Sequence, residues 1–182
     1  MLDIITQSAI IPGIFFIERP TFGDDRGFFR EYFRLNELEA AAGRPVNLVQ
    51  ANHSRSVQRV LRGVHVATYD KLIYIVSGNV QMALIDLRPD SPTFRKLEYF
   101  EAGENSRRTV FIPAGIGNSF YTVSSQVDYI YFVGEYYDPA KEQTIRWNDP
   151  DLNIPWTDSE PIVSARDRDG AKAFKDIFTD KI

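Results

Sequence analysis

The residue types with the widest range of chemistry are scarce in this chain, which has two histidines, His53 and His65, and no cysteine. The lack of cysteine excludes disulfides, thiolate catalysis and cysteine-ligated zinc. Two histidines and one carboxylate are arithmetically enough for a metal site, but there is no His-x-His pair and the spacing gives such a site no support. We therefore expect no metal.

His65 lies in LRGVHVATYDK, residues 61–71, a pattern that indicates the start of a strand. Histidine suits proton abstraction because its unperturbed pKa is about 6.5, provided that a carboxylate orients the ring. Side chains alternate along a strand, so Arg62 and Val64 should face away from His65 unless a local twist or bulge brings Arg62 to the same cavity. The alternative is a histidine that is simply hydrogen-bonded in the core.

Two further side chains suit proton transfer beside a carbonyl. Lys71 follows His65 at an even spacing, which puts both on one face if they share a strand. An ammonium near a carbonyl stabilises an enolate, whereas the alternative is a solvated lysine at a rim. Tyr131 lies in VDYIYFVGEYYDP two residues after Tyr129. A phenol acts as an acid when its surroundings tune it, and the alternative is a tyrosine packed in a barrel wall.

The elements that must position these residues are short strands. Between Pro45 and Tyr137, apolar segments recur at roughly eight to twelve residues, and turns such as Ser77-Gly78-Asn79 separate them. This rhythm predicts an all-β fold, a jelly-roll (cupin-like) barrel with short flanking helices at 34–43 and 171–178. The segment QMALIDLR suits a strand that is buried on both faces. The mouth of such a barrel is the usual place for a ligand, so polar residues that face inward are the candidates.

Composition narrows the function classes further. The 182 residues predict a single domain over 1–182, and the net charge of −4 argues against a nucleic-acid-binding surface. Residues 1–20 carry Asp3 and break at Pro12 and Gly13, so they are typical of neither a signal peptide nor a membrane span. We expect a cytoplasmic protein with no membrane partner.

Taken in order, the segments of this chain resemble one family, the dTDP-4-dehydrorhamnose 3,5-epimerases and related deoxysugar epimerases. The resemblance extends from Gly13 to Phe178 and runs through FGDDRGFFREYF, LVQANHSRS, VLRGVH, KLIYIVSGNV, IDLRPDSPTF, FIPAGIGNSF, YIYFVGEYYDP, IRWNDPDLNIPW and SARD. It implies a homodimeric, metal-free and cofactor-free jelly roll. The implied substrate is a nucleotide-linked 4-keto-6-deoxy sugar, with dTDP as the nucleotide, in deoxysugar biosynthesis.

The resemblance also implies a mechanism, in which C3, C5 or both are inverted through an enolate. His65 matches the family's base, Asp167 in SARD matches the carboxylate paired with it, and Tyr131 matches the acid on the opposite side. Lys71 and Arg62 would stabilise the enolate oxygen. The implied substrate contacts fall into three groups. Arg26 and Glu31 would contact the nucleotide across the dimer, and Gln50, Asn52 and Arg62 would contact the sugar and diphosphate. Tyr137 and Phe22 would stack on the nucleobase.

The chain departs from the family pattern in two places around the substrate. Family members usually have His-Gly-Phe after the Pro-Ala-Gly turn, where PAGIGNSF has Asn118 and Ser119. The segment between His65 and Lys71 is also shorter than the usual Pro-rich loop. Asn118 therefore predicts an altered sugar pocket, which acts at one carbon or on an unusual sugar. The alternatives are a 3,4-ketoisomerase and an inactive nucleotide-sugar-binding barrel.

Overall fold

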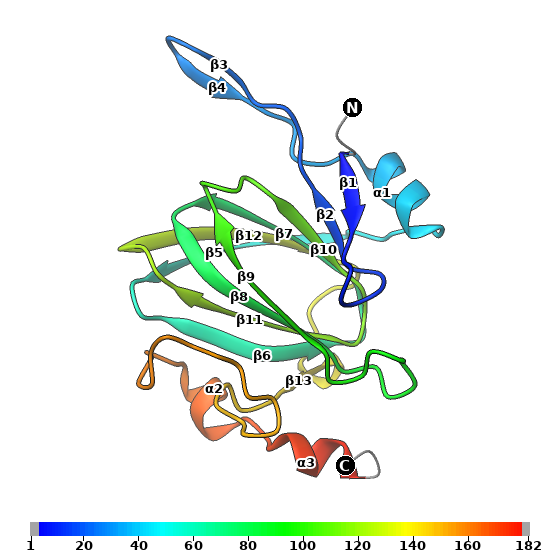
Figure 1. The fold of residues 1–182 in the computed structure, drawn as a ribbon, viewed down its shortest axis with the longest axis vertical. Helices are drawn as coiled ribbons and strands as arrows, with labels where there is room; N and C mark the ends of the chain where they lie inside the picture. The colour runs from blue at the N-terminus through cyan, green and yellow to red at the C-terminus, as the bar shows by residue number, and fades with distance from the viewer. Residues whose placement is uncertain (1–3, 180–182) are drawn as a thin grey trace.

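Two antiparallel sheets lie face to face in the structure, a computed structural model that describes residues 4–179 (Figure 1). The six-stranded sheet has the order β1 (Ile5–Gln7), β2 (Phe15–Ile17), β10 (Thr109–Ile112), β7 (Lys71–Ser77), β12 (Gln126–Val133) and β5 (Gln50–Val57). The five-stranded sheet has the order β13 (Glu142–Thr144), β6 (Leu61–Ala67), β11 (Ile116–Thr122), β8 (Asn79–Asp86) and β9 (Leu97–Gly103). The predicted all-β jelly roll is confirmed.

The main core fills the space between these sheets because β-branched and aromatic side chains alternate along the strands. Ile73 and Ile75 of β7 belong to the same buried cluster as Met82 and Leu84 of β8. The outer faces are covered too. The helix α1 (Leu35–Ala42) packs on the six-stranded sheet, and the C-terminal segment packs on the five-stranded sheet. The strand β8 is consequently buried on both faces, as its sequence predicts.

The helices are short and lie outside the sheets (Figure 1). The predicted helix 34–43 is α1, which ends at Gly43 in the left-handed conformation, with φ of 66°. The predicted helix 171–178 is reduced to α3 (Phe174–Ile177), and η1 (Pro139–Lys141) is a single 3₁₀ turn. The helix α2 (Ala165–Asp169) lies outside the two predicted helices, and the Ser164 hydroxyl caps it by accepting from the backbone N–H of Asp167.

A two-stranded hairpin, β3 (Phe22–Asp24) and β4 (Gly27–Phe29), projects away from the sheets (Figure 1). Its aromatic side chains are exposed: Phe22 by 66%, Phe28 by 61% and Phe29 by 69%. Within residues 4–179, no helix is long and apolar enough to cross a membrane.

Candidate active site

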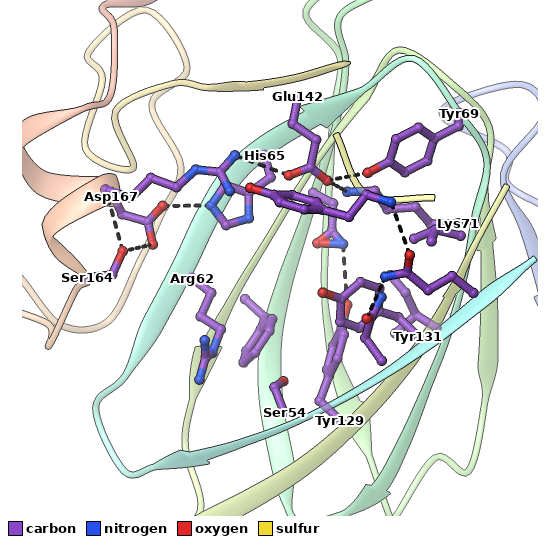
Figure 2. A pocket seen from close by; sticks show the side chains of 18 residues that line it. Ser54, Arg62, His65, Tyr69, Lys71, Tyr129, Tyr131, Glu142, Ser164 and Asp167 are labelled. Carbon is purple, nitrogen blue, oxygen red and sulfur yellow. Dashed lines mark hydrogen bonds and ion pairs between the residues drawn. The ribbon is translucent and has the colours of Figure 1, made fainter. Parts of the chain in front are cut away.

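A cavity of about 410 Å³ opens between the two sheets, within the size range of small-molecule sites (Figure 2). The strands β5, β7 and β12 supply one wall, and β6, β11, β13 and the segment around α2 supply the other. Its lining is mostly polar and comprises Gln50, Asn52, Ser54, Arg62, His65, Tyr69, Lys71, Ile73, Asn118, Phe120, Tyr129, Tyr131, Val133, Tyr137, Glu142, Ser164, Arg166 and Asp167.

A bulge in β6 puts Arg62 and His65 on the same wall. His65 pairs with Asn118 and Arg62 pairs with Phe120, so two residues of β6 lie opposite the single residue Ser119. Gly63 is needed there, because its φ is 116° and a Cβ would lie 2.6 Å from the Asn118 carbonyl oxygen. The side chains of β6 therefore do not alternate strictly between faces at this point. The structure has the bulge that the sequence analysis gave as the exception.

His65 bonds a buried carboxylate. Its Nε2 lies 2.6 Å from Oδ1 of Asp167, which is 4% exposed, and the Ser164 hydroxyl donates to Oδ2 at 2.9 Å. Burial raises the pKa of Asp167, but bonds from His65, Ser164 and the Gly63 backbone outweigh it and lower the pKa overall. A carboxylate only accepts, so Nε2 carries a proton, and in the neutral tautomer of the ring Nδ1 has the lone pair. Figure 2 shows this second ring nitrogen on the cavity side of the ring.

Lys71 belongs to the opposite wall. It begins β7 in the six-stranded sheet, whereas His65 lies on β6 in the other sheet, so the idea that one strand carries both is wrong. The chain turns between them, and both side chains still reach the cavity. The Lys71 ammonium lies 3.2 Å from Oε1 of Glu142, and the same oxygen accepts from the Tyr69 hydroxyl at 2.7 Å. Arg166 bonds the other carboxylate oxygen at 3.1 Å.

This cluster holds charges away from water. Burial lowers the pKa of Lys71, and Glu142 opposes that shift. Burial by itself would raise the pKa of Glu142, but Lys71, Tyr69 and Arg166 together lower it to about 2. Glu142 is thus an anion at neutral pH and serves as the counter-ion that keeps a buried ammonium charged.

Two tyrosines of β12 face the cavity from the six-stranded sheet. Burial raises the pKa of Tyr131, and Glu142 raises it further, so its phenol keeps its proton at neutral pH. Tyr129 is 4% exposed and stacks on Phe120 with ring centroids 4.5 Å apart. Its hydroxyl accepts from Nδ2 of Asn118 at 3.3 Å. The cavity therefore has an imidazole on one wall and a protonated phenol on the other.

Five of the predicted substrate contacts line this cavity: Gln50, Asn52, Arg62, Asn118 and Tyr137. The Gln50 amide links two of them, since its Nε2 donates to Asn52 at 2.8 Å and its Oε1 accepts from the Tyr137 backbone N–H at 3.0 Å. Arg62 donates from Nε to the Ser56 hydroxyl at 3.0 Å.

The other three predicted contacts lie outside the cavity, on or beside the hairpin. Phe22 is on β3, and among residues 4–179 Arg26 at the hairpin turn bonds only Asp24, at 2.5 Å. Glu31 bonds Arg19 and Arg34. The barrel of one chain therefore does not bring these side chains to its own cavity.

The sequence prediction misses several lining residues, among them Glu142, Tyr69, Arg166 and Ser164, which bond to predicted site residues or to one another. Ser164 has a signal, because Ser-x-x-Asp before a short helical segment is a capping pattern. Glu142 has none, since its segment follows the end of the strand rhythm. In residues 4–179, no group of three or more histidine or acidic side chains is placed to hold a metal ion.

Together, the fold and the cavity define a jelly-roll protein equipped for proton transfer at a carbon next to a carbonyl. The chain belongs to the dTDP-4-dehydrorhamnose 3,5-epimerase family, whose sequence profile matches residues 8–176.

Its relatives cover most of its length. A dTDP-4-dehydrorhamnose 3,5-epimerase of Pseudomonas aeruginosa is 39% identical over 91% of this chain and 93% of its own. A dTDP-4-dehydrorhamnose 3-epimerase of Streptomyces niveus is 36% identical over 87% of this chain and 79% of its own. Among solved structures, this chain is similar to the Legionella pneumophila epimerase RmlC, which was solved in complex with dTDP-4-keto-L-rhamnose. The TM-score is 0.88 at 32% sequence identity, and the match covers 98% of this chain and 96% of the RmlC chain.

Proposed function

We propose that this protein is an isomerase that inverts C3, C5 or both of a dTDP-linked 4-keto-6-deoxyhexose through an enolate. The single observation that carries the proposal is the placement of His65 and Tyr131 on opposite walls of one cavity. Inversion needs a base on one face of the ring and an acid on the other, and these two walls supply them.

The first step removes a proton that the 4-keto group acidifies. The lone pair on Nδ1 of His65 takes the proton from the carbon, the electrons of that C–H bond form a carbon–carbon double bond, and the carbonyl electrons move to O4. Asp167 holds the ring in the required tautomer and stabilises the imidazolium that forms.

The second step returns a proton to the opposite face. The enolate electrons reform the carbonyl, the carbon takes the proton of the Tyr131 hydroxyl, and proton exchange with water restores both side chains. The Lys71 ammonium, with Arg62, stabilises the negative charge on O4 between the two steps. Glu142 keeps Lys71 charged and Arg166 anchors Glu142, so the electrostatic support is in place before the substrate binds.

The substrate's nucleotide and diphosphate would lie toward Gln50, Asn52, Arg62 and Tyr137. We propose that the protein works as a homodimer, because the exposed hairpin carries Phe22 and Arg26 away from its own cavity and would place them, with Glu31, at the nucleotide of the partner subunit. The domain 1–182 then acts as one catalytic unit.

The proposal is tested by incubation in D₂O with dTDP-, GDP- and CDP-linked 4-keto-6-deoxy sugars. NMR of the products should locate deuterium at C3, C5 or both, with inverted configuration at the labelled carbon and with the dTDP sugar reacting fastest. A 3,4-ketoisomerase would instead move the carbonyl. An inactive barrel would bind the sugars without exchange, and either result would overturn the proposal.

A further inference from the structure

A polar contact between Asn118 and Tyr129 joins the two walls of the cavity. Asn118 on β11 is 9% exposed, and its amide reaches across to the hydroxyl of Tyr129 on β12. The ring of Tyr129 stacks on that of Phe120 with an angle of 16° between the rings, and this contact holds the phenol in place. Asn118 also pairs with His65 across neighbouring strands, so its side chain lies next to the base.

This contact leaves two donor hydrogens and one acceptor atom without a protein partner. One hydrogen of the Asn118 amide nitrogen donates to the Tyr129 oxygen, so the second amide hydrogen, the phenolic hydrogen of Tyr129 and the Oδ1 atom of Asn118 remain. Among residues 4–179, the structure pairs none of these three with another side chain or backbone group. Burial raises the pKa of Tyr129 well above its usual value, so the phenol stays protonated.

A neighbouring donor and acceptor match a hydroxyl group, which both accepts and donates. On the proposed function, on which this inference rests, the reacting hexose has its ring hydroxyls at C2 and C3 only, because C1 carries the nucleotide, C4 is a ketone and C6 is a methyl. We propose that Asn118 and Tyr129 bind one of these hydroxyls and make it a requirement for reaction. The contact then sets the position of the carbon next to His65.

The energetic reason is that a substrate without the hydroxyl leaves two buried polar groups unpaired. Sites built to hydrogen-bond a substrate hydroxyl reject analogues that lack it far more strongly than apolar pockets reject a change of size. The pair is thus a specificity determinant of the sugar pocket, whereas the proton transfers are left to His65 and Tyr131.

The test compares kcat/KM for deuterium exchange on the full sugar and on its 2-deoxy and 3-deoxy counterparts, all linked to the same nucleotide. The parent protein should prefer the full sugar over one of these analogues by about tenfold or more. Asn118→Leu and Tyr129→Phe should bring that ratio toward one, mainly through slower reaction of the full sugar. Thr122→Val, which removes a buried hydroxyl of the same strand outside the cavity, should leave the ratio unchanged.

The outcomes separate this inference from the function beneath it. If the parent protein exchanges no 4-keto sugar, the proposed function fails and this inference fails with it. If the parent exchanges but shows no preference, or if both variants slow all three sugars equally, only the present inference is overturned. Thermal unfolding checks that each variant folds, and Tyr129→Phe keeps the ring stack, so it carries the test if Asn118→Leu does not fold.

Discussion

The cavity and the β3–β4 hairpin are built in contrasting ways. In the cavity, the charged side chains that support the proposed chemistry are buried and hydrogen-bonded: Asp167 is 4% exposed and Lys71 is 8% exposed, and each contacts side chains from other elements. In the hairpin, Phe22 and Phe29 are more than half exposed, and Arg26 bonds Asp24 within its own turn. The cavity of one chain therefore already holds the groups proposed for proton transfer, whereas its hairpin exposes aromatic side chains away from its own barrel.

This difference predicts two kinds of variant. Changes in the cavity should slow the chemical step at saturating substrate, and changes in the hairpin should weaken binding while the chemical step is preserved.

The largest effect should come from His65→Ala. Loss of the base should slow deuterium exchange by about 10²- to 10⁴-fold, measured by NMR at saturating substrate. His53→Ala is the matched control, because His53 bonds Asp128 and does not line the cavity. Exchange in His65→Ala as fast as in the parent would show that the base is misassigned.

Lys71→Met should have the next largest effect. It keeps the apolar stem but removes the ammonium, so kcat should fall by about 10²- to 10³-fold, as for the loss of one donor to a developing oxyanion. Lys141→Met is the control, since Lys141 is an exposed lysine that pairs with Glu135. A kcat that stays near the parent value in Lys71→Met would remove Lys71 from the chemical step.

Glu142→Gln should change the pH dependence more than the maximum rate. Glu142 holds the pKa of Lys71 up against burial, so without this anion the ammonium loses its proton at lower pH. Because the protonated form is the active one, the alkaline limb of the kcat profile should move to lower pH. An alkaline limb at its original pH would contradict this link, and Glu135→Gln provides the control at an exposed ion pair.

Arg26→Ala should have the smallest effect on catalysis. We expect a several-fold rise in KM with kcat at saturation preserved, because the guanidinium lies outside the cavity of its own chain. Arg59→Ala, at an exposed pair with Asp158, should change neither constant. Equal effects of Arg26→Ala on KM and kcat would argue against a pure binding role for the hairpin.

Sequence patterns predict the sheets because burial imposes a regular rhythm on them. The strand β8 shows this best, since its apolar residues on both faces match the two layers that cover it. The helix α1 with Gly43 at its end follows from standard helix signals. The short α2 is missed because its formation depends on the Ser164 cap and on packing, not on an apolar periodicity.

The geometry of the site is harder to predict from the sequence, because it depends on local irregularities in the strands. Arg62 and His65 share a wall only through the bulge at Gly63, which simple alternation forbids. Lys71 and His65 meet across two sheets rather than along one strand. The Lys71 partner, Glu142, comes from the short strand β13 at a sheet edge, and no local pattern links the two residues.

The central claim is that two groups on opposite walls handle the proton in separate steps, and Tyr131→Phe tests it most directly. In D₂O, NMR would measure deuterium exchange at the substrate carbon and inversion of that carbon in the same sample. The account predicts that Tyr131→Phe keeps exchange, since His65 still removes and returns the proton on its own face, while inversion falls by about 10²-fold or more. Inversion at the parent rate, or a loss of exchange equal to that of His65→Ala, would contradict it.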